Sequence, residues 1–281
     1  IAMKQPTNIN MLFIMFPMFS STNAKKHWQK TASGICYKLY TKDKSQVRPK
    51  IGDYIWMHLV KYSPTKKEIF NTRIFDVGNG VEMQLKAVQK QVDVTEIFTH
   101  MRKGDSALVK IPCHLLDSNG SKKKHYTFRL QLIDFSTKEA YEKVQWEKEF
   151  LQAQADSLVM IEYLSMHNML DALKDAAGNY FVRQIRGNGA QLQIGDSVQL
   201  HYIGKLTTDF EFDNSYGRKQ TLAFVVGKQQ VIEGLDKGIC NFYYGDKGIL
   251  LIPSRLAYGD KSVGKIPANA VLVFDIDILP K

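Results

Sequence analysis

The sequence predicts an α+β protein made of two units, each a curved antiparallel sheet wrapped on a short helix, joined by a helical connector. Three observations predict this class. Apolar and polar residues alternate in short segments, with the period of half-buried strands. Two parts of the chain resemble one another in order. The stretch between them lacks glycine and proline, and with 281 residues the chain is long enough for two domains.

Residues 1–24 have the features of a secretory signal peptide. Lys4 precedes the apolar run from Met11 to Phe19, and small residues follow up to Ala24. The run is too short to cross a bilayer, which needs about 20 apolar residues. The sequence therefore predicts an exported protein of the periplasm or cell envelope. The alternative is a buried N-terminal helix in a cytoplasmic protein, which Pro17 disfavours.

Residues 35–136 and 179–281 are predicted to be two copies of one unit. The segment 51–58 resembles 194–201, and the segment 104–112 resembles 245–253, each around a Gly-Asp pair. Phe70-Asn71 falls near Phe212-Asp213, and Phe128 falls near Phe274. Because these points keep one order along the chain, duplication is the simple explanation.

Residues 137–178 are predicted to form the helical connector, because they are rich in strong helix formers. Gly178 is placed to cap the helix. Apolar residues recur at helical spacing and predict one apolar face, formed by Val144, Leu151, Ala155, Leu158, Ile161 and Leu164. This face either packs on the two domains or forms a dimer with a second copy.

The C-terminal unit contains the clearest strand and helix patterns. Alternation predicts strands at 198–202, 222–226 and 272–278. The spacing of Ile232, Leu235, Ile239 and Phe242 predicts one short amphipathic helix that closes the open face of the sheet.

Several strings of this unit carry a resemblance to a known family. They are His201-Tyr202-Ile203-Gly204-Lys205-Leu206, Phe212-Asp213-Asn214-Ser215, the segment 227–234, Leu251-Ile252-Pro253, Ala257-Tyr258-Gly259, and Ile266-Pro267 with the segment 272–275. In order and spacing they resemble the motifs of the FKBP-type peptidyl-prolyl cis-trans isomerases. The resemblance covers the C-terminal unit closely and, through the repeat, the N-terminal unit loosely.

Read without the family, the same side chains already suggest an apolar hollow with few polar groups. Its candidate lining is Tyr202, Phe212, Phe224, Val231, Ile232, Tyr258, Ile266 and Phe274. No nucleophile, metal cluster or phosphate loop accompanies them in the sequence, so the prediction includes no metal and no cofactor. Rotation about an X-Pro amide needs no covalent chemistry, and amide resonance sets its barrier at about 18–20 kcal/mol.

The resemblance implies a role for each position. The implied catalytic residues are Tyr202, Phe212, Asp213, Tyr258 and Phe274, and the implied substrate-binding residues are Arg218, Leu222, Phe224, Val231, Ile232, Leu235 and Ile266. The proline ring would lie against Tyr202, Phe224, Leu235 and Phe274, while the Ile232 backbone N–H and the Tyr258 hydroxyl would bind substrate carbonyls. Proline-containing polypeptides are the implied substrates, and macrolides the implied inhibitors.

Each residue taken alone has a simpler interpretation. Tyr202 and Phe274 alone would be ordinary core aromatics, Asp213 a turn former and Arg218 its surface partner. The sequence also departs from the family pattern, with Leu235 where many members carry Trp, Leu222 in place of an aromatic, and Ala268 in place of a second proline. A leucine floor fills less space, so altered activity or inhibitor affinity is expected with the fold retained.

The N-terminal unit departs much further. Leu59 is aligned with Tyr202 and Asn71 with Asp213, and no Tyr-Gly follows Ile111-Pro112. The sequence therefore predicts an inactive unit used for binding or spacing.

Charge and cysteine content disfavour other classes of function. The net charge is +10, but the densest basic run, Lys122 to Lys124, lies beside Asn119-Gly120 in a predicted solvated loop, so no nucleic-acid partner is predicted. A weaker alternative is an interaction platform built on that loop. The three cysteines show no metal or redox spacing and are predicted to be small buried residues.

The sequence thus predicts an isomerase of X-Pro bonds that assists protein folding. The alternative is a chaperone or assembly module in which both units bind polypeptide without catalysis, favoured by Leu235, Leu222 and the degenerate first unit.

Overall fold

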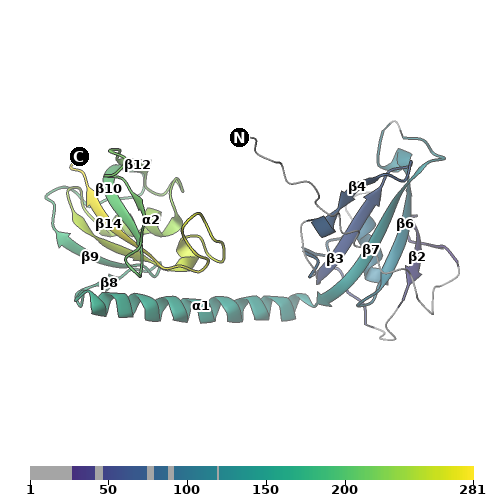
Figure 1. The fold of residues 1–281 in the computed structure, drawn as a ribbon, viewed down its shortest axis with the longest axis horizontal. Coiled ribbons are helices and arrows are strands. Elements are labelled where there is room, and N and C mark those ends of the chain that lie inside the picture. Colours follow the sequence, from purple (N-terminus) through teal and green to yellow (C-terminus); the bar gives the residue numbers. More distant parts are fainter. Residues whose placement is uncertain (1–26, 42–46, 75–78, 88–91, 119) are drawn as a thin grey trace, which may run out of the picture. The chain divides into compact units, whose positions relative to one another are not determined.

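The computed structural model describes residues 27–41, 47–74, 79–87, 92–118 and 120–281. The predicted signal peptide, 1–24, lies outside the described residues. The chain divides into two compact units, residues 1–144 and 145–281 (Figure 1). No helix among the described residues is long and apolar enough to cross a membrane.

The first unit is built on a seven-stranded antiparallel sheet. Its strands are β1 (Gln29–Lys30), β2 (Cys36–Tyr40), β3 (Tyr54–Tyr62), β4 (Glu68–Asn71), β5 (Val81–Gln84), β6 (Ser106–Pro112) and β7 (His125–Ser136). The strand order is β1-β2-β6-β7-β3-β4, and β5 pairs with β3.

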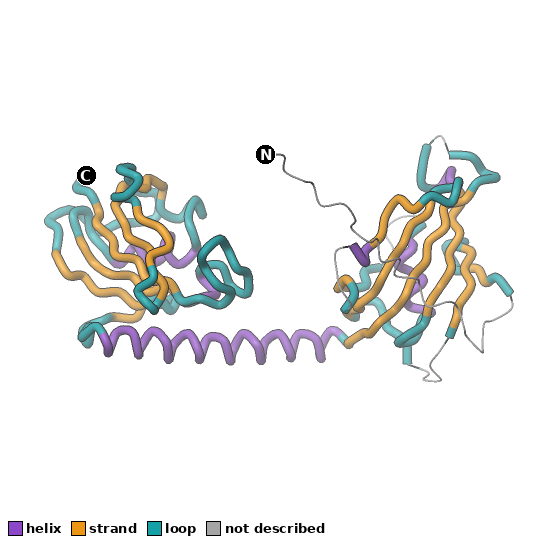
Figure 2. The backbone as a smooth tube through the Cα atoms, viewed as in Figure 1, coloured by secondary structure: helices purple, strands orange, loops and turns teal. Residues whose placement is uncertain are grey.

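The second unit has a sheet of the same design. Its strands are β8 (Leu173–Lys174), β9 (Tyr180–Ile185), β10 (Ser197–Leu206), β11 (Glu211–Asn214), β12 (Leu222–Val225), β13 (Lys247–Ile252) and β14 (Leu272–Ile278). The order is β8-β9-β13-β14-β10-β11, and β12 pairs with β10. Each strand therefore has a counterpart at the same place in the first sheet. Figure 2 shows the strands of both sheets in orange. The predicted α+β class with two sheets is confirmed.

Few helices accompany the sheets. The first unit contains the short 3-10 helices η1 (Thr72–Ile74), η2 (Val94–His100) and η3 (Cys113–Leu115). The second contains α2 (Glu233–Gly238), η4 (Ile239–Asn241) and η5 (Ser254–Leu256). The single helix predicted from Ile232 to Phe242 is thus α2 followed directly by η4. Its apolar side chains, Leu235, Ile239 and Phe242, are all buried in the core of the unit.

The Gly-Asp pairs of the two units form equivalent turns. Gly52 and Gly195 have φ of +99° and +96°, values that glycine adopts without a Cβ clash. The Asp53 carboxylate accepts a hydrogen bond from the Lys50 N–H at 2.8 Å, and Asp196 accepts one from the Gln193 N–H at 3.0 Å. The same short sequence therefore folds in the same way twice.

Strand register corrects one predicted equivalence. Asn71 pairs with Val60 as Asn214 pairs with Ile203. In both sheets one further residue pair follows before the register shifts. Asn71 therefore occupies the place of Asn214, and Phe70 occupies the place of Asp213. The prediction that Asn71 matches Asp213 was wrong by one residue, because it aligned Phe70-Asn71 with Phe212-Asp213 by residue type, whereas strand pairing sets the equivalence.

The connector helix, α1 (Lys138–Met166), ends twelve residues before the predicted cap at Gly178. Asn168 adopts a left-handed φ of +55°, and the Met169 N–H donates to the Leu164 carbonyl at 2.8 Å. This is the Schellman ending, with asparagine in the place that glycine usually takes. Gly178 instead lies in the turn between β8 and β9, where it has φ of +102°.

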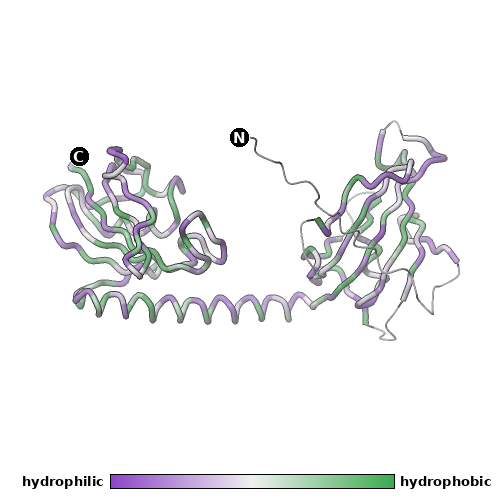
Figure 3. Tube along the Cα trace, in the orientation of Figure 1, coloured by the Kyte–Doolittle hydropathy of each residue, from purple (hydrophilic) through white to green (hydrophobic). Residues whose placement is uncertain are grey.

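The buried side of α1 also differs from the prediction. Apolar segments recur along the helix (Figure 3), but Val144, Leu151, Leu158 and Ile161 are exposed, and of the predicted face only Leu164 is buried. Apart from Leu164, the predicted face is therefore not covered by the second unit. The buried residues are Asp156, Met160, Tyr163 and Leu164, and two of them carry polar groups that an apolar pattern cannot detect.

The sheet of the second unit is covered on both faces. On one face Leu250, Ile252 and Phe274 pack with α2 in the main core. On the other face Leu251 and Val273 pack with Met160, Tyr163 and Leu164 of α1. Alternate residues of β13 thus point to different apolar environments, which explains the unbroken apolar run 249–252.

Candidate functional site

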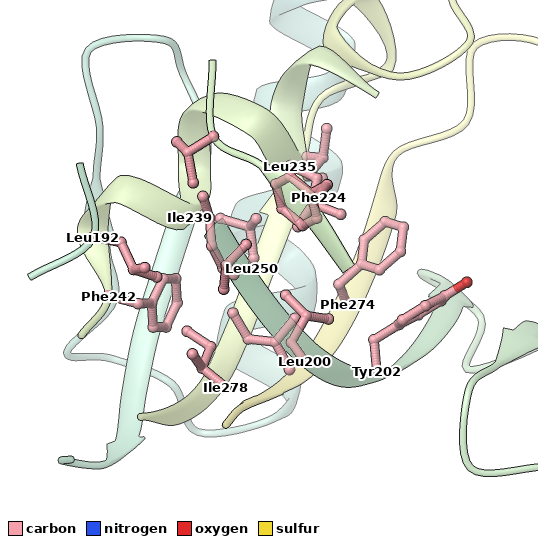
Figure 4. Packing of buried hydrophobic residues seen from close by; sticks show 14 of the residues in the cluster. Leu192, Leu200, Tyr202, Phe224, Leu235, Ile239, Phe242, Leu250, Phe274 and Ile278 are labelled. Atoms are coloured by element: carbon pink, nitrogen blue, oxygen red, sulfur yellow. The ribbon is translucent and has the colours of Figure 1, made fainter. Parts of the chain in front are cut away.

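The predicted aromatic and aliphatic residues meet at one end of the main core of the second unit. Figure 4 shows Phe224, Leu235, Phe274 and Tyr202 side by side, at the opposite end from Leu192, Phe242 and Ile278. Buried members of this core include Tyr202, Phe224, Leu235, Ile266 and Phe274, and partly buried Phe212, Leu222, Val231 and Ile232 pack against it. Four strands, α2 and two loops therefore contribute to one apolar surface.

The aromatic rings are held at fixed angles. The Phe274 ring lies 5.7 Å from the Tyr202 ring, and 5.9 Å from the Phe212 ring in an edge-to-face arrangement. Gly204 makes this arrangement possible, because a Cβ at this position would lie 2.6 Å from the Phe212 ring. The glycine in the string 201–206 thus has a packing role in the site.

A polar group lies at the edge of the aromatic cluster. The Tyr202 hydroxyl donates a short hydrogen bond to the Asp213 carboxylate. The Arg218 guanidinium forms an ion pair with the same carboxylate, and its second nitrogen donates to the Tyr202 hydroxyl at 2.9 Å. The guanidinium also lies over the Tyr202 ring, 5.6 Å from its centroid. Arg218 is therefore part of the site rather than an isolated surface partner of Asp213.

Ser215 forms hydrogen bonds with the backbone of Tyr202 and was not predicted as a site residue. Its buried hydroxyl accepts from the Tyr202 N–H at 2.8 Å and lies 3.1 Å from the Tyr202 carbonyl. The Ser215 N–H also donates to that carbonyl at 3.0 Å. The position of the Tyr202 side chain is therefore fixed through its own backbone. The available signal was a serine within the string 212–215.

Asp236 likewise fixes the backbone of the segment before α2 by hydrogen bonds. This buried carboxylate accepts from the backbone N–H of Gly227 at 2.7 Å and of Gln229 at 3.0 Å. The segment 227–232 leads to Ile232, the N-cap residue of α2, whose carbonyl accepts from Leu235 and Asp236. The Ile232 N–H precedes the helix and so lies outside its hydrogen bonds.

Tyr258 lies on the loop between β13 and β14. It is 36% exposed, unlike the buried rings of the cluster. The loop is shaped by η5 and by hydrogen bonds from Gly259 to the Ser254 carbonyl at 2.9 Å and from Asn269 to the Gly259 carbonyl at 2.7 Å. Ile266 is 6% exposed and belongs to the core. The loop therefore has one member in the apolar surface and one hydroxyl exposed to solvent.

The first unit lacks the polar part of this site. Leu59 takes the place of Tyr202, because its backbone N–H donates to the Thr72 hydroxyl at 2.9 Å as that of Tyr202 donates to Ser215. Phe70, in the place of Asp213, is 46% exposed. The arrangement that joins a phenol, a carboxylate and a guanidinium in the second unit therefore has no equivalent at these positions.

The arrangement in the second unit suits a dry, apolar ligand group with a few hydrogen bonds at its rim. Among the described residues, no group of three or more His, Cys, Asp or Glu side chains is placed to hold a metal ion. Rings and aliphatic side chains provide its floor.

Comparison with known proteins identifies the family. The model of the FKBP-type peptidyl-prolyl cis-trans isomerases matches residues 189–279. FK506-binding protein 1A of Neurospora crassa is 43% identical over 98 residues, which cover 34% of this chain and 82% of the relative. The chain belongs to the FKBP family. The resemblance expected from the sequence motifs is thereby confirmed for the second unit.

Other members of the FKBP family match the same region. FK506-binding protein 2 of Debaryomyces hansenii is 48% identical over 85 residues, 30% of this chain. The chain spans 63% of the length of that relative and 64% of its counterpart in Aspergillus fumigatus. The crystal structure of FkpA from Escherichia coli is 30% identical, with a TM-score of 0.40, and the match covers 50% of this chain and 65% of that chain.

Proposed function

We propose that the second unit isomerises X-Pro bonds in polypeptides and thereby assists protein folding. The observation that carries the proposal is the cluster of Tyr202, Phe224, Leu235 and Phe274 in a chain of the FKBP family. We assign the catalytic role to Tyr202, Phe212, Asp213, Tyr258 and Phe274. Substrate binding is assigned to Arg218, Leu222, Phe224, Val231, Ile232, Leu235 and Ile266. Family membership does not favour the alternative of a purely non-catalytic chaperone.

The proposed mechanism depends on the exclusion of water from the apolar surface of the second unit. A planar amide is more dipolar than a twisted one, so a site without water disfavours the planar ground state relative to the transition state. Phe274 is 6% exposed and Leu235 is 2% exposed, so a proline ring that packs on them is removed from contact with water. Donors at Tyr258 and Ile232 then bind the carbonyls that flank the bond.

Tyr258→Phe tests the hydroxyl. Loss of one hydrogen bond, worth about 1 kcal/mol, should lower kcat/KM for a short X-Pro peptide about fivefold. The measurement is the cis-to-trans rate with the full chain and with the variant, followed also in the presence of a macrolide, which should inhibit the parent. An equal rate for parent and variant would remove Tyr258 from the mechanism.

We propose that residues 35–136 form a degenerate FKBP-like domain and residues 179–281 the isomerase domain. The equivalent strand order and Gly-Asp turns support duplication. In the first unit Leu59 stands at the position of Tyr202 and Phe70 at that of Asp213, and these differences support a unit without catalysis.

We also propose that residues 1–24 direct export, in which case mass spectrometry of the exported protein should find a chain beginning near Lys25.

We further propose that α1 pairs with α1 of a second copy. The side of α1 opposite its buried residues carries the exposed side chains of Leu151 and Leu158. Leu151 and Leu158 are 64% and 69% exposed and seven residues apart, the spacing of a coiled-coil seam.

Light scattering of Leu158→Glu tests this dimer. A charge in the seam should convert the dimer to a monomer, whereas Leu170→Glu, at a residue that is 85% exposed and lies beyond the helix, should leave it intact. A parent chain that is monomeric at high concentration would contradict the proposal.

A further inference from the structure

Helix α1 contains a buried carboxylate that does not belong to the apolar packing. Asp156 is 2% exposed. Its Oδ2 atom accepts hydrogen bonds from the Ser254 N–H at 2.8 Å and from the Ser254 hydroxyl at 2.7 Å, and Oδ1 accepts from the Gln152 side chain at 2.7 Å. A carboxylate is costly to bury without partners. The three hydrogen-bond donors offset that cost and fix the carboxylate against Ser254.

Ser254 begins the loop that carries Tyr258. The Ser254 carbonyl accepts from the Ala257 N–H at 3.0 Å and from the Gly259 N–H at 2.9 Å, the residues on either side of Tyr258. The Ser254 side chain is itself buried, at 1% exposure. The position of the Tyr258 backbone therefore depends on Ser254, and that of Ser254 depends on Asp156.

A second pair of contacts joins α1 to the turn between β10 and β11. The Tyr163 hydroxyl donates to the Asp209 carboxylate at 3.1 Å, and a ring nitrogen of His167, just beyond the helix, lies 3.3 Å from the other carboxylate oxygen. Burial, with the nearby Asp209 charge, raises the pKa of Tyr163, so the phenol stays protonated and donates. Asp209 has φ of +62° and precedes β11, which carries Phe212 and Asp213.

Two grooves flank the Asp156–Ser254 contact. One, of about 960 Å³, is lined by Gln152, Arg255, Gly259 and Asn269 among others. The second, of about 270 Å³, lies between α1 and residues 267–271. Because open volume lies on both sides, no packed side chain replaces the contact when the carboxylate is removed.

We infer that α1 is a working part of the isomerase site, in which Asp156 positions the loop that carries Tyr258 and Tyr163 positions the turn that precedes Phe212. The inference rests on the proposed isomerase function. The helix holds each loop by a polar contact and holds the sheet by the separate apolar cluster of Met160, Leu164 and Val273. Removal of a polar contact therefore loosens a loop while the helix stays in place.

The test uses the full chain with Asp156→Ala, Asp156→Asn and the control Glu162→Gln, at an exposed residue of the same helix. Asp156→Ala should lower kcat/KM for an X-Pro peptide about fivefold, the loss expected for Tyr258→Phe, because Asp156 acts through the position of Tyr258. Asparagine keeps one acceptor for Ser254 and should restore most of the rate. Glu162→Gln should match the parent.

A double-mutant cycle with Tyr258→Phe separates positioning from general destabilisation. If Asp156 acts through Tyr258, then Asp156→Ala should change the rate of the Tyr258→Phe chain by less than about twofold, because the two residues act as one unit. A fivefold loss in that background would show that Asp156 acts elsewhere and would overturn the inference.

Further outcomes are equally informative. Should Asp156→Ala fail to fold, Tyr163→Phe provides the test, because it removes only the hydroxyl that donates to Asp209. The parent rate in a folded Tyr163→Phe chain would then overturn the inference. A folded Asp156→Ala chain with the parent rate would overturn it directly. An inactive parent would instead refute the proposed function, a result distinguished by the absence of catalysis in every chain.

Discussion

Replacement of Phe274 by alanine is expected to lower kcat/KM for an X-Pro peptide about 10- to 100-fold. The ring lies 5.7 Å from that of Tyr202 and 5.9 Å from that of Phe212, and in the proposed mechanism it provides apolar surface for the substrate proline. Burial of one such side chain is worth about 1.5–3 kcal/mol, and each 1.36 kcal/mol is about tenfold in rate. The measurement is the cis-to-trans rate of the peptide at saturating protease or by exchange spectroscopy.

Phe274 also belongs to the core, so the variant needs a control for folding. Phe274→Leu keeps an apolar side chain on β14 and should retain the fold while losing the edge-to-face contact with Phe212. Its rate should lie between those of the parent and Phe274→Ala. Parent activity in a folded Phe274→Ala chain would exclude the aromatic cluster as the site of catalysis.

Replacement of Phe242 by alanine is expected to lower the stability of the second unit and to leave its catalytic rate unchanged. Phe242 is 0% exposed, and its ring meets that of Phe181 edge to face at 5.8 Å, at the end of the core far from Tyr202 (Figure 4). A cavity of this kind costs about 3–5 kcal/mol in the free energy of unfolding. The rate per folded molecule should stay close to that of the parent, because no site residue loses a neighbour.

Urea unfolding of the full chain, followed by fluorescence and circular dichroism, measures this cost for the second unit. Phe210→Ala is a matched control, since Phe210 is 49% exposed and its truncation should cost less than about 1 kcal/mol. Equal costs for the two phenylalanines would contradict the assignment of Phe242 to the core.

The sequence was sufficient to predict the strands and the apolar part of the site. Alternation of Val198, Leu200 and Tyr202 reports directly on which side chains face the core, because a strand has a fixed period of two. The motif strings then placed Phe224, Leu235 and Phe274 together, and the structure shows them in one cluster.

The polar supports could not be predicted in the same way. Ser215, Asp236 and Asp156 each bind backbone groups of residues distant in the sequence, and which amides come within reach depends on the folded loops. The end of α1 was misplaced for a related reason, because Asn168 supplies the left-handed residue that was expected from a glycine. The buried side of α1 was missed because Asp156 and Tyr163 do not fit an apolar pattern.

The central claim is that the second unit accelerates rotation about X-Pro bonds. The most direct test is the cis-to-trans rate of a short X-Pro peptide with the full chain, compared with the uncatalysed rate, whose timescale is tens to hundreds of seconds. The account predicts a rate that rises in proportion to protein concentration and falls in Phe274→Ala. A folded chain that leaves the uncatalysed rate unchanged would contradict the account and would leave a protein that binds polypeptide on an isomerase fold.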